Sequence, residues 1–373
     1  LMNIFSIFDF LLRKKNKFGF EIQDIKSRWP HYSNGLILDS KSLGEPVWIV
    51  GSLWFEKWFL GLEERLETVM GKRLIHASSE AMEFFLVSNI IKKPKNNNID
   101  NWKTIKLDFF EKGLGDFSFF DEDSGDIKIL IQNYTNLNIA IGYLSAIWEY
   151  MTNKRFKSSW VDSESHVLLT LTPILDTFPS PLYNGNFIED FHKYSIVNNA
   201  EWWEILTISP AGNWSINNSN KIIVSNDIFE RFIQLSIPYL NTVKFLRSNN
   251  YSWDIGDKNE SLWWSAAADS AREQFYSDSF HIMIREPEDW KNIGARHLQR
   301  TGLGKITNAK YCDSENGILL SLDSVFHPSI TCGILLGCWE RAYGRNGKLI
   351  LTRSIDNYFV KIISTHMEID DNS

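Results

Sequence analysis

The chain has few cysteines, and their positions give no sign of a cross-link or a metal site. Three occur among 373 residues, Cys312, Cys332 and Cys338, and none belongs to a CxxC pair. Any disulfide scheme leaves one of them unpaired, which is typical of proteins from a reducing compartment. We therefore expect a cytoplasmic protein without structural disulfides, in which Cys338 fills core volume as a small apolar residue.

Positive charge and long apolar runs are also scarce. The chain has 39 Lys and Arg against 46 Asp and Glu, which gives a formal net charge of −7. Such a chain does not gather phosphate backbones, so no nucleic-acid partner is expected. The apolar stretch at residues 4–12 is too short to cross a bilayer, and its basic residues follow it instead of preceding it. No transmembrane segment and no secretory signal are predicted.

Paired metal ligands and nucleophile motifs are missing as well. The eight histidines lack the spacing that places two imidazoles on one face of a helix. No cysteine has a base assigned to it that would make it a nucleophile. We therefore predict no metal site, no cofactor and no catalytic residue.

What the chain does have is an internal repeat. Residues 333–340 (GILLGCWE) have a related copy at residues 142–149 (GYLSAIWE), 191 residues earlier. Four further pairs of segments recur in the same order, which chance similarity does not explain. These pairs are residues 54–58 with 228–232, 80–85 with 270–275, 113–115 with 302–304, and 127–131 with 318–322.

The hydrophobic pattern within each half predicts an α+β fold in which helices alternate with antiparallel hairpins. The Gly-x-Gly segments are expected to form tight turns, because they lack the third glycine of a dinucleotide-binding loop. The predicted elements of the first half are a strand at 47–50, a helix at 53–70 closed by Gly71, a helix at 78–91, a hairpin at 117–120 and 127–131, a helix at 138–151, and a hairpin at 156–161 and 167–171.

A chain of 373 residues is too long for one ordinary core and suits two domains. We predict two tandem copies of one module, with N-terminal helices and an antiparallel sheet, packed about a pseudo-twofold axis. The predicted segments are an N-terminal extension (1–46), a first module (47–171), a connection (172–220) that includes a strand at 202–208, a second module (221–365) and a tail (366–373).

The order of motifs in each half resembles the 4-vinyl reductase domain, a ligand-binding α+β module. The resemblance rests on residues 302–305, 315–322, 333–344 and 349–352, and on 113–116, 125–131 and 142–149 in the first half. It implies a fold shared with heme-nitric-oxide-binding domains and with subunits of the TRAPP tethering complex. Many members hold a structural zinc with cysteines near the last hairpin. Residues 158–167 and 352–360 contain no cysteine, so this zinc is not expected here.

Family roles include sensing aromatic compounds, assisting the reduction of tetrapyrrole vinyl groups, and assembly, and the fold does not choose among them. We expect a non-catalytic, sensor-like protein that binds a small hydrophobic or aromatic molecule. Two alternatives stay open, namely an enzyme or accessory factor acting on a tetrapyrrole or another hydrophobic molecule, and a structural assembly subunit without ligand. A protein partner or a homodimer is compatible with each of them.

The repeated pairs Trp148-Glu149 and Trp339-Glu340 are the first candidate ligand-binding residues. In one interpretation each Trp forms the wall of a pocket and each Glu lies at its rim. In the other, Trp packs beneath the sheet and Glu is solvated or caps a backbone group. We expect the glycines of these helices to let helix and sheet approach closely.

Trp263, Trp264 and His297 complete the candidate set. The two tryptophans follow residues 249–261, a stretch that is longer than its counterpart in the first half. They either close a ligand cavity that the first half lacks or fill the core. His297 lies near a helix, where heme-binding relatives use a helical histidine, but an ordinary half-buried histidine fits the same position.

Overall fold

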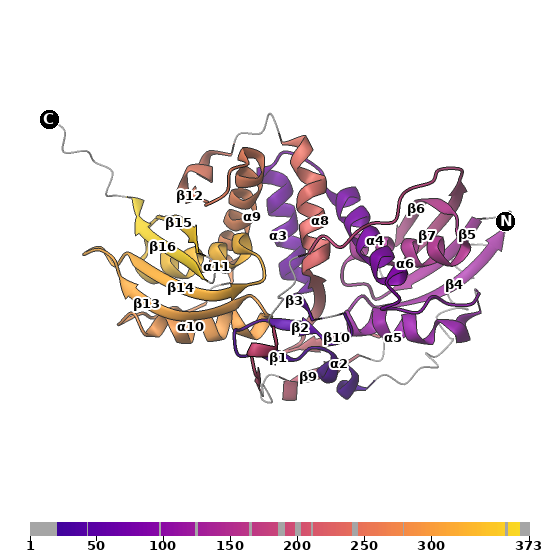
Figure 1. The fold of residues 1–373 in the computed structure, drawn as a ribbon, viewed down its shortest axis with the longest axis horizontal. Coiled ribbons are helices and arrows are strands. Elements are labelled where there is room, and N and C mark those ends of the chain that lie inside the picture. Colours follow the sequence, from indigo (N-terminus) through magenta and orange to yellow (C-terminus); the bar gives the residue numbers. More distant parts are fainter. Residues whose placement is uncertain are drawn as a thin grey trace.

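Two antiparallel strands, one from each half of the chain, lie at the centre of the computed structural model (Figure 1). These are β3 (Glu45–Gly51) and β11 (Ser219–Ser225), and Ile49 lies opposite Ile223 in their ladder. Both strands are rich in β-branched residues, which favour a buried strand. The structure describes residues 21–42, 44–96, 98–123, 126–163, 166–185, 191–197, 203–209, 212–240, 245–278, 280–354 and 357–365.

Short strands from the extension and the connection widen this pair into a seven-stranded sheet, in the order β8-β1-β2-β3-β11-β10-β9. A small core that includes Trp29, Phe110 and Trp214 covers one face of it. The extension and the connection are therefore built into the fold. The added strands are β1 (His31–Tyr32), β2 (Ile37–Asp39), β8 (Ile196–Val197), β9 (Leu206–Ile208) and β10 (Trp214–Ile216).

Two outer sheets lie at opposite ends of the molecule (Figure 1). The first has the order β4-β5-β7-β6, and the second has the order β12-β15-β16-β14-β13, in which only β12 joins its neighbour in parallel. Helices and antiparallel sheets together confirm the predicted α+β class. The strands are β4 (Asp116–Asp123), β5 (Asp126–Gln132), β6 (Arg155–Ser163), β7 (His166–Ile174), β12 (Tyr251–Ser252), β13 (Gly304–Tyr311), β14 (Ile318–Val325), β15 (Gly347–Arg353) and β16 (Tyr358–Ser364).

The helices between the sheets cross from one half to the other. α3 (Ser52–Arg65) follows β3 but packs against α9 (Lys258–Ser277), and α8 (Asn226–Ser236) follows β11 but packs against α4 (Gly71–Val87). Where α3 and α8 meet in the middle of Figure 1, Trp58 stacks on Phe229 with ring centroids 5.8 Å apart. One hydrophobic core therefore runs through both halves without a break.

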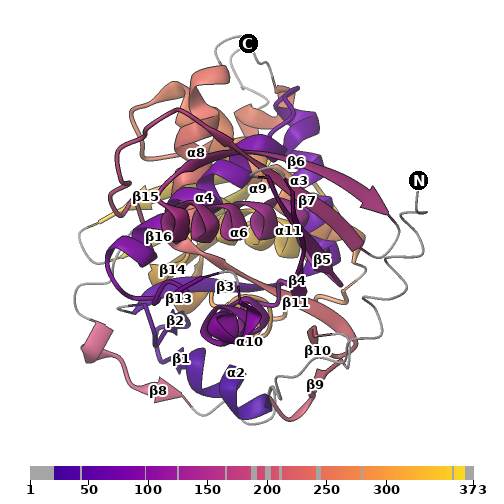
Figure 2. The ribbon, with the colours of Figure 1, turned by 90° about the vertical axis from the view of Figure 1, so that its right-hand side faces the viewer.

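α6 (Leu137–Thr152) lies against α4, and α11 (Pro328–Tyr343) lies against α9. Figure 2 shows α4 and α6 together beside the first outer sheet. A Cβ atom at Gly142 would stand 2.2 Å from a carbonyl oxygen of α4, and one at Gly333 would stand 2.2 Å from a carbonyl oxygen of α9. The expectation that these glycines serve helix-to-sheet contact is wrong, because both allow two helices to approach.

The remaining helices are short and lie at the edges of the core. They are α2 (Ile22–Arg28), α5 (Lys103–Glu111), α10 (Asp289–His297), and the 3-10 turns η1 (Ile99–Trp102), η2 (Phe191–Lys193), η3 (Ile237–Tyr239), η4 (Leu246–Asn250) and η5 (Gln299–Thr301). Across the part of the chain that the structure describes, no helix combines the length and apolarity needed to cross a membrane.

Several element boundaries differ from the sequence prediction, and the helix expected at 78–91 spans Gly71–Val87. The helix expected to end at Gly71 ends at Arg65, and Gly71 is the first residue of α4. Leu66 and Met70 are buried in the turn between the two helices. The helical spacing of apolar residues therefore continues across the turn and hides the end of α3. Of the strand expected at residues 202–208, only Leu206–Ile208 forms β9, and Trp202 lies outside the described residues.

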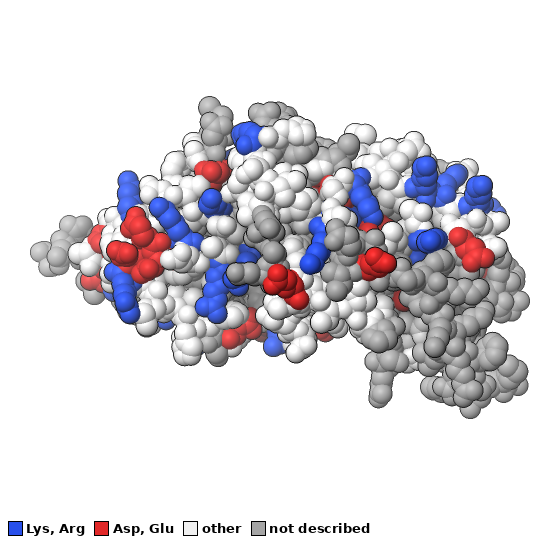
Figure 3. All heavy atoms as spheres, turned by 90° about the horizontal axis from the view of Figure 1, so that it is seen from below, with Lys and Arg blue, Asp and Glu red and all other residues white. Residues whose placement is uncertain are grey.

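The Gly-x-Gly segments form tight turns as predicted. Gly113 and Gly115 have φ values of 72° and 103°, and Gly302 and Gly304 have values of 86° and 115°. Side chains rarely adopt this conformation, so glycine is required. The apolar stretch at residues 4–12 and the tail at 366–373 lie outside the described residues. On the face shown in Figure 3, basic and acidic side chains are interspersed.

Candidate functional site

The β3–β11 ladder has a cavity at each of its two ends. The cavity at the end where Val47 pairs with Ser225 has a volume of about 20 Å³, and the cavity where Gly51 pairs with Lys221 has a volume of about 390 Å³. We call them the charged cavity and the lysine cleft. Ligand sites in proteins usually measure roughly 300–1,000 Å³, and a volume near 20 Å³ holds about one water molecule.

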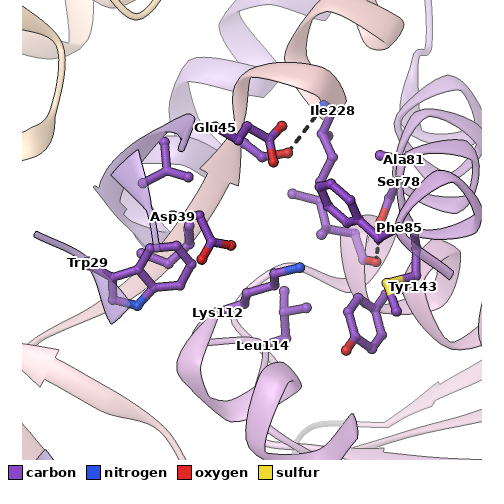
Figure 4. Close-up of a pocket in the computed structure, with 15 residues that line it drawn as sticks. Trp29, Asp39, Glu45, Ser78, Ala81, Phe85, Lys112, Leu114, Tyr143 and Ile228 are labelled. Atoms are coloured by element: carbon purple, nitrogen blue, oxygen red, sulfur yellow. Dashed lines mark hydrogen bonds between the residues drawn. The ribbon is translucent and has the colours of Figure 1, made fainter. Parts of the chain in front are cut away.

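Ion pairs connect most of the charged groups in and beside the charged cavity. Figure 4 shows Lys112 reaching into it, with Asp39 on one side and Tyr143 on the other. Beside it, Arg28 forms ion pairs with Asp39 at 2.9 Å, with Asp108 at 2.6 Å and with Glu111 at 2.5 Å. Burial acts to raise the pKa of Asp108, but the charges of Arg28 and Lys112 hold it well below its ordinary value.

Glu45 is the one carboxyl group around this cavity that carries a strongly raised pKa. Burial, reinforced by the nearby charge of Asp227, raises the pKa of Glu45 to about 8. Its Oε1 accepts a hydrogen bond from the backbone N–H of Asp227 at 2.9 Å. Convergent titratable groups favour catalysis where a substrate can reach them. A water-sized cavity gives no such access, so we interpret this cluster as structural.

Aromatic and aliphatic side chains form the walls of the lysine cleft. Most of them come from β3, α3, α9 and α11, so both halves of the chain contribute. Rings offer apolar area at a low cost in conformational entropy, which suits a binding wall. The apolar lining includes Trp48, Ile49, Val50, Leu53, Trp54, Phe275, Phe280, Leu303 and Ile334.

His297 forms part of the same wall as a neutral ring. Its centroid lies 5.0 Å from that of Phe275 and 5.0 Å from that of Phe280. Burial lowers the pKa of His297 to about 4, and the charges of Arg296 and Arg300 add to this effect. At neutral pH the imidazole is therefore uncharged, and it contributes a ring face more than a charge.

Ser219 and Lys221, next to Gly51, form the polar floor of the cleft, and Lys57, Asp278, Arg296 and Thr301 are its other polar lining residues. The ammonium of Lys221 lies 3.4 Å from the hydroxyl oxygen of Ser219. A Cβ atom at Gly51 would stand 3.0 Å from that oxygen and 3.8 Å from Lys221 Nζ, so glycine leaves both groups accessible. Burial lowers the pKa of Lys221. Within the described ranges, no carboxylate forms an ion pair with this ammonium.

A third hollow, the α4–β6 groove, lies in the first half and has a volume of about 760 Å³. Five of its charged residues form ion pairs, whereas Lys72, Lys157 and Asp176 also line it and form none among the described residues. Arg155 forms ion pairs with Glu83 and Glu149 at 2.8 Å each, and Arg231 forms ion pairs with Asp227 at 3.0 Å and Glu80 at 3.1 Å. A charged ligand would have to displace these pairs, so this groove is the weaker candidate despite its size.

Comparisons with known proteins were negative. The chain matches no protein-family model, no curated protein and no solved structure. The resemblance to the 4-vinyl reductase domain therefore stays a prediction from the sequence motifs. In the residues that the structure describes, no group of three or more His, Cys, Asp or Glu is placed to hold a metal ion.

The two predicted glutamates cap backbone groups in the same way. Glu149 Oε1 accepts a hydrogen bond from the N–H of Phe156 at 2.9 Å, and Glu340 Oε1 accepts one from the N–H of Gly347 at 3.0 Å. Each bond ties the end of a helix to the strand that follows it. This geometry corresponds to the capping interpretation, although Glu149 also lines the α4–β6 groove.

The two tryptophans that precede these glutamates are buried in the core. Trp148 is 4% exposed and stacks on Trp102, with ring centroids 6.3 Å apart. Trp339 is fully buried, and its indole N–H donates to the carbonyl oxygen of Asn316 at 2.9 Å. Neither residue lines the lysine cleft. Cys338 is also buried, as predicted.

Trp263 and Trp264 pack against other rings of the second half. Trp263 lies edge-on to Phe229, with centroids 5.7 Å apart, and Trp264 lies edge-on to His327 at 4.8 Å. The preceding stretch, residues 249–261, supplies β12 to the outer sheet. Of the seven predicted ligand-binding residues, His297 is the one that lines the lysine cleft.

Sequence reasoning missed the polar part of the cleft. The sequence motifs assign no role to Lys221, which lies in β11 next to the apolar residues 222–224. A signal was present, because the repeat aligns Lys221 with Val47, 174 residues earlier, where the first half has an apolar residue. A lysine in place of a buried valine marks a position where the two halves differ in chemistry.

Proposed function

We propose that this chain is a non-catalytic binding protein for a small hydrophobic molecule, and that the lysine cleft holds this molecule. The observation that supports the proposal is the cleft itself, a space of about 390 Å³ with ring-bearing walls and a small polar floor. The charged cavity is too small for a ligand. This is the sensor-like role that the resemblance to the 4-vinyl reductase domain implies.

We further propose that the two halves are copies of one 4-vinyl-reductase-like module about a pseudo-twofold axis. Ile49 and Ile223, which lie opposite each other in the β3–β11 ladder, are also partners in the repeat. The outer sheets share one strand order, since β6-β7-β5-β4 corresponds to β15-β16-β14-β13. Gly142 and Gly333 have the same close helix contact. These parallels support duplication.

The site is tested by filling each hollow in turn and measuring a neutral fluorescent probe, Nile red. Ser219 and Ser158 are half-buried strand residues that line the lysine cleft and the α4–β6 groove, respectively. We expect Ser219→Trp to abolish most of the saturable fluorescence increase, because the indole occupies the cleft. Ser158→Trp is the matched control and should leave it unchanged. The opposite result would move the site to the groove.

The assembly alternative is supported by the nearly filled cavity in the first half. Native mass spectrometry of the protein purified from its own source, with an absorbance spectrum, separates the two functions. A retained hydrophobic molecule supports ligand binding. An apo mass in an oligomer, together with no saturable probe binding, would reject our proposal in favour of assembly.

A further inference from the structure

We infer that the molecule held in the lysine cleft is a carboxylic acid with an apolar body, and that Lys221 and Ser219 bind its carboxylate. This inference rests on the proposed function, and it assigns the chemical class of the ligand. It is carried by the composition of the cleft, in which the half-buried Lys221 and Ser219 lie next to each other among rings and aliphatic side chains.

The charge of the lining is opposite to that of the whole chain. Lys57, Lys221 and Arg296 line the cleft, against one acidic residue, Asp278. The fifth titratable member of the lining, His297, is a neutral ring at neutral pH. A protein with a formal net charge of −7 therefore has a cleft with an excess of positive charge. Clefts with low-dielectric walls concentrate such a field and attract anions.

The four charged residues that line the cleft differ in their exposure to water and in their charged neighbours. Lys57, Asp278 and Arg296 are exposed, and the charge of Lys57 acts on Asp278. Lys221 is half-buried, and within the described ranges it has no carboxylate partner. A desolvated ammonium without a counter-ion gains more from an incoming anion than a hydrated one does.

The donors on the floor match a carboxylate more closely than a phosphate. The ammonium of Lys221 and the hydroxyl of Ser219 lie 3.4 Å apart, so each can donate to one oxygen of the same carboxylate. Phosphate sites in proteins usually offer more donors, from backbone N–H groups or an arginine fork. Gly51 leaves the floor open to such a group.

The test uses ligands that share one apolar body and differ in the head group, namely naphthoate, naphthamide, naphthyl phosphate and naphthylmethylamine. Titration calorimetry on the full chain should show naphthoate binding about tenfold more tightly than naphthamide, because charge-assisted hydrogen bonds are stronger than neutral ones. Lys221→Met should remove this preference, and Lys221→Arg should restore part of it. Lys157→Met removes an exposed lysine of the α4–β6 groove, outside the cleft, and is the control that should keep it.

Each outcome decides between the inference and the proposal beneath it. Equal affinity for naphthoate and naphthamide, or a preference that survives in Lys221→Met, overturns the carboxylate assignment and leaves hydrophobic binding intact. Tighter binding of naphthyl phosphate would also overturn the assignment and replace it with a phosphate ester. The proposed function itself is rejected if none of the four ligands binds and the Nile red fluorescence is the same in Ser219→Trp as in the parent chain. If Lys221→Met does not fold, the ligand series on the unaltered chain and on Lys221→Arg still decides.

Discussion

The charged cavity and the lysine cleft lie at opposite ends of one strand pair, yet one is filled and the other is open. In the proposed repeat, Glu45 corresponds to Ser219 and Asp108 to His297. The first half thus has two carboxyl groups where the second has a hydroxyl and a neutral ring. Glu45 lines the first cavity and Asp108 pairs with Arg28 beside it, whereas the second cavity keeps its space.

The N-terminal extension accounts for much of this difference. It supplies Trp29 and Asp39 to the lining of the charged cavity and Arg28 beside it, and the indole N–H of Trp29 donates to the carbonyl oxygen of Glu111 at 3.2 Å. None of these residues lines the lysine cleft. One end of the strand pair is therefore closed by a segment that precedes the repeat. The comparison teaches that the same backbone frame can serve as a structural anchor or as a binding site, according to what covers it.

Removal of Arg28 is expected to have the largest effect, because this side chain neutralises three carboxylates. Arg28→Met would leave Asp39, Asp108 and Glu111 buried without their main counter-ion. Breaking a buried ion pair typically costs about 3–5 kcal/mol. We expect urea denaturation to show a loss of this size in the free energy of unfolding.

Lys41→Met provides the matched control for Arg28. Lys41 also pairs with Glu111, at 2.7 Å, but its side chain is 47% exposed. Exposed pairs contribute about 0–1 kcal/mol, so this variant should lose little stability. Equal losses in the two variants would show that the charged cavity is not the anchor that the comparison requires.

The pH dependence of stability should distinguish the two ends through Glu45. Its pKa is raised from 4.5 to about 8, so the folded state retains a proton that the unfolded chain releases. Stability from this group therefore falls as pH rises from about 5 to 8, by up to about 1.4 kcal/mol per pH unit. Glu45→Gln keeps the acceptor oxygen for the Asp227 N–H and cannot ionise.

We expect the free energy of unfolding of Glu45→Gln, measured against the parent chain, to rise steadily across this pH range. Charged neighbours, among them Asp39, Asp227 and Lys112, are present in both proteins and cancel in the difference. The corresponding variant at the open end, Ser219→Ala, should show no such trend. A flat difference for Glu45→Gln would mean that the carboxyl group is ionised in the folded protein.

The helix contacts offer a test of whether the halves are otherwise equivalent. Gly142→Ala and Gly333→Ala each place a Cβ atom 2.2 Å from a backbone carbonyl oxygen. Overpacking of this kind costs about 1–3 kcal/mol, and the two losses should be similar if the halves share one design. Gly256→Ala is the control, since nothing lies within 4 Å of its added methyl group. A large loss at one glycine alone would argue against equivalent modules.

Much of the local structure could be predicted from the sequence, because it depends on local patterns. The hairpin formed by residues 117–120 and 127–131 follows from two apolar runs on either side of a polar turn, and the tight turns follow from Gly113 and Gly302. The packing of α3 and α8, each against a helix of the other half, could not be predicted in this way. An apolar stripe on a helix shows which face is buried but not which neighbour covers it.

The site was harder to predict than the fold for a related reason. Trp148, Trp263 and Trp339 stood out as candidates because large rings are conspicuous, yet each fills the core. A binding cavity depends on where side chains leave space, and no single residue encodes that. Lys221 could have been found by asking where the two copies differ in charge.

The smallest expected effect concerns the exposed charged residues at the rim of the lysine cleft. Lys57 and Arg296 are exposed, in contrast to Lys221 on the floor and Arg28 in the closed cavity. Because water and salt screen exposed charges, Lys57→Gln or Arg296→Gln should weaken naphthoate binding by less than about fivefold, and mainly at low ionic strength. The loss in Lys221→Met should persist at high salt. Titrations at low and high salt compare the two classes directly, and a salt-independent loss at either rim residue would place that side chain in contact with the ligand.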